Sequence, residues 1–552
     1  MRVMQWRWVT GWRRVLGAVA LAGMAGCSVA PTVLPVPPGA TDAVPVPPGA
    51  TDAVPVADTR SSLPPYWYTG AFIEVFVRSY QDSDGDGIGD LKGLTSRLDY
   101  LRDLGVRGIW LMPVTRSADH DHGYAVTDYR AIERDYGSLQ DFDEFIRQAH
   151  ARGIGVIMDY VLNHSAAQHP FFTQSRSSVS NPFHDWYVWQ PTMPLGWDVW
   201  GKNPWTMTPV GAFYATFGPH MPDFNLRNPR VVAYHDDSLR FWLNRGLDGF
   251  RFDAVPHLIE NGPQAWNDQP ESHALMAQVR ALVNRYDNRY IVCEATANPV
   301  SWSQPQSCGS AFAFEHERDV IRAAKGDLSA LPVLAAFFRT RPLTMATMLT
   351  NHDSFVGDRL WNQFAGDLSA YRLAAATYLL QPGIPFIYYG EEIGMADGQL
   401  AGDARLRTPM SWAGDARTAG FTTGQPYRGL SANVATHNAA AEQRDPQSLL
   451  AWYRTLLAVR NTYASVARGS YEHAQVDGAV LSWQRHLGNE VTVTAIHYGS
   501  QAQPLTLHHL AAGQSLRAVL PADAAAVPVG AQGEATVMMA PRSVRVWVMQ
   551  RP

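Results

Sequence analysis

Short apolar runs alternate with amphipathic stretches along most of the chain, from about residue 66 to about residue 464. The runs have the length of buried strands, and the stretches between them repeat apolar residues every three or four positions, as helices do. One such helical face is formed by Leu94, Leu98, Leu101 and Leu104. The expected strands are 72–79, 106–112, 154–162, 247–253, 289–294, 312–316, 344–351 and 384–390. Eight strand–helix units predict an α/β fold, a (β/α)8 TIM barrel of parallel strands wrapped by helices.

Two regions depart from this alternation. Residues 165–225 are rich in Pro, Trp and Phe and follow the third expected strand. They are too long for an ordinary loop, so we expect an inserted subdomain there. Beyond about residue 465, alternating runs such as VLSWQRH and SVRVWVMQ replace the helical pattern and predict an antiparallel β-sandwich over 465–552. The barrel is then expected to comprise residues 66–164 and 226–464.

The first 27 residues have the pattern of an export signal. Several arginines precede the apolar run 15–26, which is too short to cross a bilayer. The run ends in Met-Ala-Gly-Cys, which resembles the cleavage box of bacterial lipoproteins and predicts lipidation of Cys27, with a plain secretory signal as the alternative. Ser28 follows, where an Asp would suggest retention in the inner membrane, so we expect an exported envelope lipoprotein facing the periplasm or in the outer membrane.

A Pro-rich spacer is expected over residues 28–65. The decapeptide PVPPGATDAV occupies 35–44 and is repeated without change at 45–54. Such closely spaced prolines favour extended polyproline geometry and cannot donate the hydrogen bonds of a sheet. The spacer would hold the folded body away from a membrane, which the chain is expected to contact through its lipid anchor only.

Composition and charge narrow the function classes. The chain has 552 residues, of which 46% are hydrophobic and 17% charged, and this excludes a disordered protein. The net charge is −5, and no basic cluster follows the N-terminal segment, so no nucleic-acid partner is expected. Besides Cys27 the only cysteines are Cys293 and Cys308, which either pair in an oxidising compartment or stay as two buried thiols. The sequence carries no signal for the oligomeric state.

Carboxylates stand at the ends of three expected strands, where barrel enzymes place their active sites. They are Asp253 in GFRFD, Glu294 after the apolar run YIVC, and Asp353 in NHD. Alternation along the strand puts Arg251 on the same face as Asp253, and its charge favours the ionised form of that carboxylate. Apolar surroundings would let Glu294 keep a proton near neutral pH. Three carboxylates so placed predict glycoside hydrolysis.

The segments DYVLNH, GFRFD, Glu294 after its strand, and TNHD resemble, in this order, the four signature segments of the alpha-amylase family, glycoside hydrolase family 13. GIWLMP and GIPFIYYGEEIGM match two further segments, so the resemblance runs from about residue 66 to the end. It implies a retaining double displacement with Asp253 as nucleophile, Glu294 as acid/base and Asp353 as transition-state stabiliser. It also implies a set of residues around the sugar to be cleaved, of which Tyr124 would stack on the ring: His122, Tyr124, His164, Arg251 and His352.

Within the family, two features bear on specificity. MPDFN at 221–225 resembles members intermediate between neopullulanases and oligoglucosidases, and Ala254 stands where relatives specific for α-1,6 bonds usually carry Val. We therefore expect an alpha-amylase that cleaves α-1,4 bonds in starch, maltodextrins and related α-glucans. The alternatives are an exo-acting alpha-glucosidase, a cyclomaltodextrinase, or a glucan-transferring or trehalose synthase-like enzyme. Pro256-His257 replaces a common Lys-His pair, which leaves the leaving-side preference open.

An inactive binding protein built on the same barrel is the alternative outside enzymes. Such proteins have lost catalytic carboxylates, whereas this chain retains all three.

An acidic loop follows the first expected strand. Asp82, Asp84, Asp86 and Asp90, with the backbone carbonyl of Ile88, offer the oxygen ligands that calcium prefers. The twelfth position is Gly, so the loop is not an EF-hand. Oligoglucosidase-like members of the family carry a similar loop, and this resemblance implies a structural calcium ion. A solvated Asp/Gly turn is the alternative, and a second calcium site at Asn163 stays open.

Overall fold

Seven short parallel strands form the central sheet in the computed structural model, which describes residues 44–57 and 59–550. The sheet order is β10-β9-β5-β2-β1-β12-β11. The strands are β1 Phe72–Val75, β2 Gly108–Leu111, β5 Gly155–Tyr160, β9 Gly249–Phe252, β10 Tyr290–Cys293, β11 Ala346–Thr347 and β12 Ile384–Tyr388. The expected export signal, Cys27 and most of the first decapeptide lie outside the described residues.

The predicted barrel is confirmed, but its expected sixth strand does not form. Segment 312–316 forms no strand. Instead, single bridges from Ala311 to Cys293 and from Phe312 to Ala346 join β10 to β11 and close the sheet. Extended chain cannot continue here, because Glu315 adopts the left-handed conformation (φ 77°) and helix α8 begins at His316.

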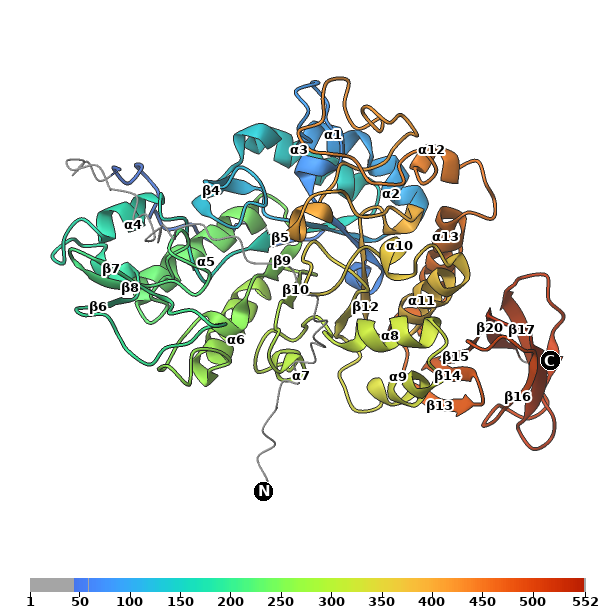
Figure 1. Cartoon of the computed structure of the whole chain (residues 1–552). Coiled ribbons are helices and arrows are strands. Elements are labelled where there is room, and N and C mark those ends of the chain that lie inside the picture. Colours follow the sequence, from blue (N-terminus) through green and yellow to red (C-terminus); the bar gives the residue numbers. More distant parts are fainter. Residues whose placement is uncertain (1–43, 58, 551–552) are drawn as a thin grey trace, which may run out of the picture. The chain divides into compact units, whose positions relative to one another are not determined.

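Helices lie outside the sheet, between consecutive strands (Figure 1). The helical face predicted from Leu94 to Leu104 is buried, although Arg97 divides it between two helices. The helices of this layer are α1 Leu91–Ser96, α2 Leu98–Leu104, α3 Leu139–Ala151, α5 Pro229–Asn244, α6 Pro270–Val283, α7 Pro299–Trp302, α8 His316–Ala324, α9 Leu331–Phe337, α10 Leu360–Gln363, α11 Leu368–Leu380, α12 Ala439–Glu442 and α13 Leu449–Thr462. None of the helices within the described ranges is long and apolar enough to cross a membrane.

Alternation along the strands separates two cores. Outward side chains such as Ile73 and Phe250 pack under the helices, while inward ones such as Phe72, Trp110 and Phe386 fill the barrel. Towards the carboxyl ends of the strands, the side chains that point into the barrel are polar. Glu74, Asp159 and Arg251 stand at inward positions of β1, β5 and β9, and each is buried.

A glycine makes the pairing of β9 with β10 possible. Gly249 begins β9 at φ 148°, and a Cβ there would lie 1.6 Å from the carbonyl oxygen of Tyr290. Only glycine tolerates both this conformation and this approach. The strand that carries Arg251 thereby reaches its register beside β10, with Arg251 opposite Val292.

The segment expected as an inserted subdomain contains helix α4 Pro170–Ser175 and a small antiparallel sheet of order β6-β8-β7. Its strands are β6 Trp189–Gln190, β7 Trp205–Thr208 and β8 Gly211–Tyr214. A hairpin of β3 Thr115–Ser117 and β4 Val126–Ile132 lies between β2 and α3.

The predicted C-terminal antiparallel domain is confirmed. The helical pattern ends with α14 Ala464–Arg468, and a sheet of order β13-β14-β15-β20-β17-β18 follows, with β16 and β19 paired separately. Trp483 of β14 joins the main core, whereas Trp547 of β20 joins a second core within the domain. Its strands are β13 Glu472–Asp477, β14 Val480–Leu487, β15 Glu490–His497, β16 Gln503–Leu507, β17 Ser515–Leu520, β18 Val527–Pro528, β19 Ala535–Met539 and β20 Ser543–Gln550.

The second decapeptide does not stand free of the body, as a spacer would. The backbone N–H of Val54 donates to Asp237 Oδ1 at 2.8 Å, and its carbonyl accepts from Arg240 Nε at 2.6 Å. The N–H of Ala57 donates to Asn244 Oδ1 at 3.0 Å. Proline-rich chain leaves its carbonyls and remaining N–H groups unpaired, and polar side chains of α5 bind them here.

The two remaining cysteines are paired. A disulfide joins Cys293, the last residue of β10, to Cys308, with their Cα atoms 6.2 Å apart. Of the two alternatives that the sequence left open, a disulfide or two buried thiols, the structure shows the disulfide. The bridge ties the end of β10 to the segment that enters the closing bridge at Ala311.

Candidate active site

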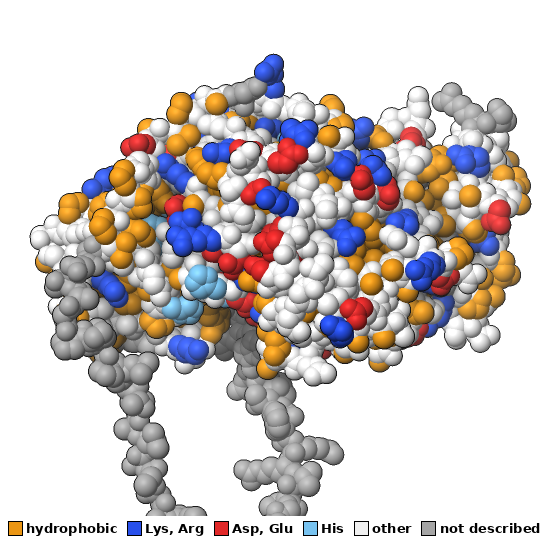
Figure 2. All heavy atoms as spheres, turned by 90° about the horizontal axis from the view of Figure 1, so that it is seen from above, with side chains coloured by type: hydrophobic (Ala, Val, Ile, Leu, Met, Phe, Trp, Pro, Cys, Tyr) orange, Lys and Arg blue, Asp and Glu red, His pale blue; other side chains and the backbone are white. Residues whose placement is uncertain are grey.

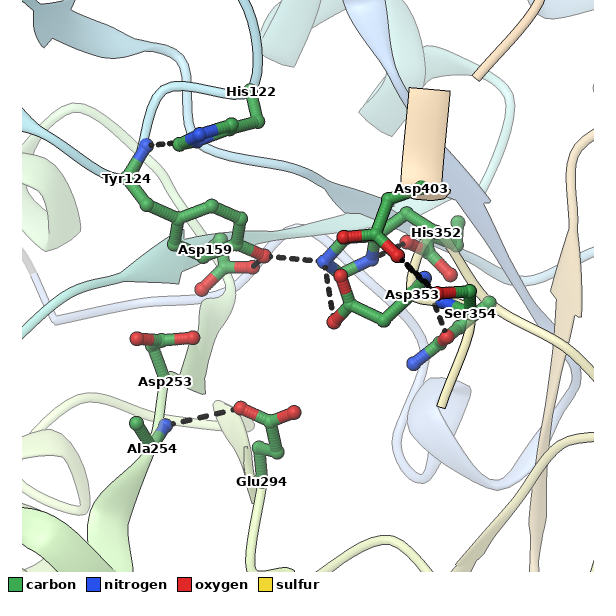
Figure 3. Close-up of polar contacts among 12 residues, drawn as sticks. His122, Tyr124, Asp159, Asp253, Ala254, Glu294, His352, Asp353, Ser354 and Asp403 are labelled. Atoms are coloured by element: carbon green, nitrogen blue, oxygen red, sulfur yellow. Dashed lines mark hydrogen bonds and ion pairs between the residues drawn. The ribbon is translucent and has the colours of Figure 1, made fainter. Parts of the chain in front are cut away.

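Three carboxylates surround one cavity at the carboxyl ends of the barrel strands. Asp253 follows β9, Glu294 follows β10, and Asp353 lies in the loop after β11; in Figure 3, Asp253 and Glu294 face Asp353 across an open space. The cavity has a volume of about 650 Å³. On the face shown in Figure 2, acidic side chains gather near the centre with histidines beside them.

One guanidinium connects the carboxylates of three neighbouring strands. Arg251 Nη1 lies 2.7 Å from Asp159 Oδ1 and 2.7 Å from Asp253 Oδ1, and Nη2 lies 2.8 Å from Glu294 Oε2. The Arg251 side chain is 1% exposed, so water does not screen these pairs. The planar fork of Arg can bind several acceptors at fixed angles, and it holds Asp253 and Glu294 side by side.

A second buried cluster supports the other side of the cavity floor. His352 Nδ1 lies 2.5 Å from Glu74 Oε1, and its Nε2 lies 2.7 Å from the hydroxyl of Tyr124. That hydroxyl donates to Asp159 Oδ2 at 2.9 Å, so this cluster and the Arg251 cluster share Asp159. Asp353 joins the cluster through His352 Nε2 at 3.2 Å. The polar contacts therefore run without a break beneath the cavity.

Asp353 is also held from above the barrel. Arg407 Nη2 donates to Asp353 Oδ1 at 3.0 Å, and Arg407 Nε donates to the carbonyl of His352 at 3.0 Å. Next to it, Asp403 Oδ1 accepts from the backbone N–H of Ser354 at 2.9 Å. Both contacts come from the segment after β12 and fix the loop that carries Asp353.

Burial dominates the protonation of the nucleophile candidate. We expected Arg251 to favour the ionised form of Asp253, and its charge does lower the pKa of this carboxyl. Burial has the larger effect, however, and the nearby carboxylate of Asp159 adds to it, so the pKa of Asp253 is raised overall.

The pKa of Glu294 is also raised, as predicted from its apolar strand. Burial is the main cause, and the charge of Asp253 adds to it, while Arg251 acts in the opposite direction. The backbone N–H of Ala254 donates to Glu294 Oε2 at 3.1 Å, because Ala254 adopts the left-handed conformation (φ 48°). Asp253 and Glu294 thus share one cation while each disfavours the charge of the other.

The histidines around the site are neutral. Burial lowers the pKa of His164 to about 3, and it holds the pKa of His352 well below the ordinary value. Within the described part of the chain, His164 Nε2 has no hydrogen-bond partner, although this residue lines the cavity. A neutral imidazole with a free nitrogen can exchange a hydrogen bond with a sugar hydroxyl.

The structure brings most of the predicted residues to the cavity wall. His122, Tyr124, His164, Asp253, Glu294 and Asp353 line it. Arg251 and His352, which we expected around the sugar, are instead buried beneath the wall and bind the lining side chains.

Sequence reasoning missed several residues of the site. Asp159 is the first residue of the DYVLNH segment, which the sequence already singled out. It lies two positions after Ile157 on the same strand, so both side chains point into the barrel, and this alternation could have identified it. Arg407 and Asp403 lie in irregular chain after β12, where no periodicity marks them. Trp200 and Phe217 also line the cavity and come from the inserted segment.

Aromatic side chains form one wall of the cavity. The Trp200 ring lies 5.2 Å from His257 and 5.6 Å from Phe217, measured between centroids. The ring of Trp266 stacks on that of His257, with the two rings 8° from parallel. Trp200 is 59% exposed although it touches this cluster. Such a wall offers ring faces to an apolar face of a ligand.

The acidic loop is only partly assembled as predicted. Asp82, Asp84 and Asp86 place carboxylate oxygens within 4.8 Å of one another. Partial burial, and then the charges of Asp84 and Asp82, raise the pKa of Asp86, so a cation among them would relieve repulsion. Asp90, predicted as a further ligand, uses Oδ1 to cap α1 at the N–H of Gly93 and Oδ2 to accept from the N–H of Ser83. Ile88 contributes its N–H to Asp86 Oδ1 at 2.8 Å.

Known proteins resemble this chain over most of its length. Residues 74–469 match the model of the alpha amylase catalytic domain. Alpha-amylase 3 of Dictyoglomus thermophilum is 34% identical over 434 residues, covering 77% of this chain and 84% of that protein. Trehalose synthase/amylase TreS of Mycolicibacterium smegmatis is 34% identical over 480 residues, covering 76% and 81%.

Among solved structures, trehalulose synthase MutB of Pseudomonas mesoacidophila is 26% identical, with a TM-score of 0.74, and the match covers 88% of this chain and 100% of that one. The family match covers far more than half of the sequence and includes the strands that carry Arg251, Asp253 and Glu294. The chain therefore belongs to the alpha-amylase family, glycoside hydrolase family 13.

Proposed function

We propose that this enzyme is a retaining alpha-amylase that hydrolyses α-1,4-glucosidic bonds in starch, maltodextrins and related α-glucans. The observation that carries the proposal is the pair Asp253 and Glu294, held by the two terminal nitrogens of one buried guanidinium at the cavity wall. Carboxylates bound to one guanidinium are held close together. Retaining glycosidases keep theirs about 5 Å apart, whereas inverting enzymes need roughly 6.5–9.5 Å for a water molecule.

In the first step, Asp253 attacks the anomeric carbon from the face opposite the leaving oxygen. The α-linkage breaks, Glu294 gives its proton to the departing oxygen, and a β-linked glycosyl-enzyme forms. The role of Glu294 is supported by its raised pKa, which keeps the proton available, and the role of Asp253 is supported by Arg251, whose charge partly offsets the rise in the pKa of Asp253 that burial causes.

In the second step, Glu294 takes a proton from water, and the resulting hydroxide attacks the anomeric carbon. The bond to Asp253 breaks and the sugar leaves with its original α configuration. Asp353, held by Arg407 and His352, would bind hydroxyls of the sugar, and His122, Tyr124 and His164, which line the same cavity, would surround the ring.

Glucan transfer is the second candidate, and it rests on the same first step. A sugar hydroxyl in place of water would receive the glycosyl group from Asp253. Relatives named trehalose synthase/amylase and trehalulose synthase favour this candidate. An oligo-1,6-glucosidase is 29% identical over 516 residues, so exo action on short substrates is the remaining variant.

Early products separate these candidates. Wild-type enzyme given soluble starch should release a mixture of maltodextrins while long chains shorten quickly, because an endo-acting site cleaves internal bonds. Chromatography of samples from the first minutes checks this, with maltose and a cyclodextrin as parallel substrates. Glucose alone from starch would favour the exo-acting variant, and trehalose from maltose would favour the transferring one. Either result would contradict the amylase proposal.

Substitutions of Asp253 and Glu294 should have different effects on catalysis. Asp253→Ala should lose all turnover, because no glycosyl-enzyme can form. Glu294→Gln should lose roughly 100- to 10,000-fold on starch. It should lose much less in the first step on α-glucosyl fluoride, because fluoride departs without a proton. Kinetics on both substrates measure the difference.

Added azide sharpens this test. It should replace water in the Glu294→Gln variant and give α-glucosyl azide, since two inversions retain configuration. A β-azide, or equal impairment on fluoride and starch, would overturn the assignment.

We further propose a structural calcium ion at the acidic loop. Asp82, Asp84 and Asp86 would hold it, and the ion would neutralise their charges and stabilise the loop before α1. The loop lies beside the segment after β12, because Thr422 Oγ1 donates to Asp82 Oδ2 at 2.5 Å. The ion takes no part in bond breaking.

Removing the metal should lower stability. An ion that binds only the folded state adds about 2.7 kcal/mol to the free energy of unfolding at a concentration 100 times its Kd. Wild type should therefore melt at a lower temperature in excess chelator, and Asp86→Ala should melt early with or without it. Asp103→Ala, which changes an exposed Asp on α2, serves as control and should respond to chelator as wild type does. Chelator-independent melting of wild type would contradict the site.

For the location of the enzyme, we propose the bacterial cell envelope, with a lipid on Cys27 as the only membrane contact. The disulfide between Cys293 and Cys308 supports export, because such bonds persist in oxidising compartments. Cys27→Ser should move the protein from the membrane fraction to the soluble fraction of the cell, as fractionation and immunoblotting would measure. A variant that stays with the membrane would contradict lipidation.

A further inference from the structure

A second, larger hollow of about 1290 Å³ lies on the inserted segment. Its floor is one face of the β6-β8-β7 sheet. Trp205 and Met207, two positions apart on β7, point to this face, and both line the hollow. Met207 is 49% exposed, although the strand partners of this face, Ala212 and Tyr214, are buried. The face is thus apolar and only partly covered.

Trp197 extends this apolar surface. It comes from the loop between β6 and β7, and its ring meets Trp205 and Tyr214 edge to face, with centroids 5.6 and 5.2 Å apart. Neither neighbour covers it completely, and the side chain stays half-buried at the wall of the hollow. Aromatic faces of this kind bind the apolar face of a sugar ring.

Polar groups of mixed charge rim the hollow. Arg227 and His184 lie on it together with Asp185 and Glu260, and Arg227 Nη2 donates to the amide oxygen of Asn261 at 2.6 Å. Arg227 and Asp185 carry opposite charges, so the rim has no cluster of one sign that would select an anion or a cation. Aromatic faces with scattered hydrogen-bonding groups instead suit a neutral ligand rich in hydroxyls.

The hollow and the active-site cavity are built from the same stretches of chain. Trp197 lines the hollow and Trp200 lines the cavity; likewise Glu260 lines the hollow and His257 the cavity. Each pair is three residues apart, and three residues of extended chain span at most about 11 Å. The two hollows therefore approach each other closely along both stretches.

The shared boundary lies on the leaving-group side of the proposed reaction. Glu294, which protonates the departing oxygen, stands next to Ala254, whereas Asp353 and Asp403 lie across the cavity (Figure 3). Ala254 and His257 belong to the stretch that continues to Glu260. A sugar chain that extends beyond the broken bond would leave past Trp200 and His257 and reach the hollow.

We infer that this hollow binds the reducing-end part of a long linear α-glucan while its other part occupies the active site. Trp200 contacts the first units after the scissile bond, and Trp197 with Met207 contacts later units. The inference rests on the proposed hydrolysis of α-glucans and assigns the hollow to longer substrates. Short oligosaccharides end before they reach it.

The test compares substrate lengths in variants of the hollow. Trp197→Ala should raise KM for maltoheptaose and amylose about three- to tenfold, the range expected for loss of one aromatic contact, and leave kcat/KM for maltotriose within about twofold. Met207→Ala, which removes an exposed side chain, should act in the same direction by about two- to threefold. Leu195→Ala is the matched control, because Leu195 is 86% exposed on the same loop and lines neither hollow.

End-labelled substrate gives a second readout. Maltoheptaose labelled at its reducing end should yield longer labelled fragments with wild type than with Trp197→Ala, because the variant no longer holds units beyond the broken bond. Equal effects on maltotriose and maltoheptaose, or an unchanged fragment pattern, would overturn the inference alone. A wild type inactive on every linear α-glucan would overturn the proposed function as well.

Discussion

Three carboxylates of the site, on neighbouring strands, depend on one buried guanidinium. Arg251 lies inside the barrel at 1% exposure and forms ion pairs with Asp159, Asp253 and Glu294, which belong to β5, to the end of β9 and to the end of β10. Buried carboxylates without a partner would protonate or destabilise the fold, and breaking a buried pair costs about 3–5 kcal/mol. Folding to this state therefore requires three strands in register and three side chains pointing inward.

The same constraint explains why the floor of the cavity consists of fixed strand residues while its walls consist of loop residues. The floor is made by strand residues such as Glu74, Asp159 and Arg251, which hydrogen bonds and burial fix in place. The walls come from loops, such as the β3–β4 hairpin with Tyr124 and the stretch with Trp200. Chemistry at the floor can stay constant while loops alter which sugars reach it, as barrel enzymes commonly allow.

The sequence predicted what periodicity and strand ends determine. The barrel, the C-terminal sheet and the convergence of Asp253, Glu294 and Asp353 follow from alternation and from strand order. How far each side chain lies beneath the cavity wall was harder to predict. Arg251 and His352 were placed around the sugar, whereas the pleat and the narrow barrel interior put them beneath the wall.

Contacts between distant segments also escaped prediction. Arg407 reaches Asp353 from irregular chain 54 positions away, and Asp90 caps a helix instead of joining the acidic cluster. Local patterns do not encode such pairings. The expected sixth strand is a related case: it does not form, and the left-handed backbone at Glu315 cannot be recognised from an apolar run.

With the proposed lipid on Cys27, the docked second decapeptide would limit how far the enzyme can reach from the membrane. Among the described residues, the first contact with the body is made by Val44, whose carbonyl accepts from Gln174 Nε2 at 3.2 Å. From Cys27 to Val44 are 17 peptide units, a contour of at most about 60 Å, whereas a spacer free up to Tyr66 would allow about 140 Å. Docking of the decapeptide thus reduces the maximum length of free chain between Cys27 and the body to less than half. Molecules anchored in the proposed way would act only in a thin layer above the bilayer, and they would hydrolyse only the substrate that diffuses into that layer.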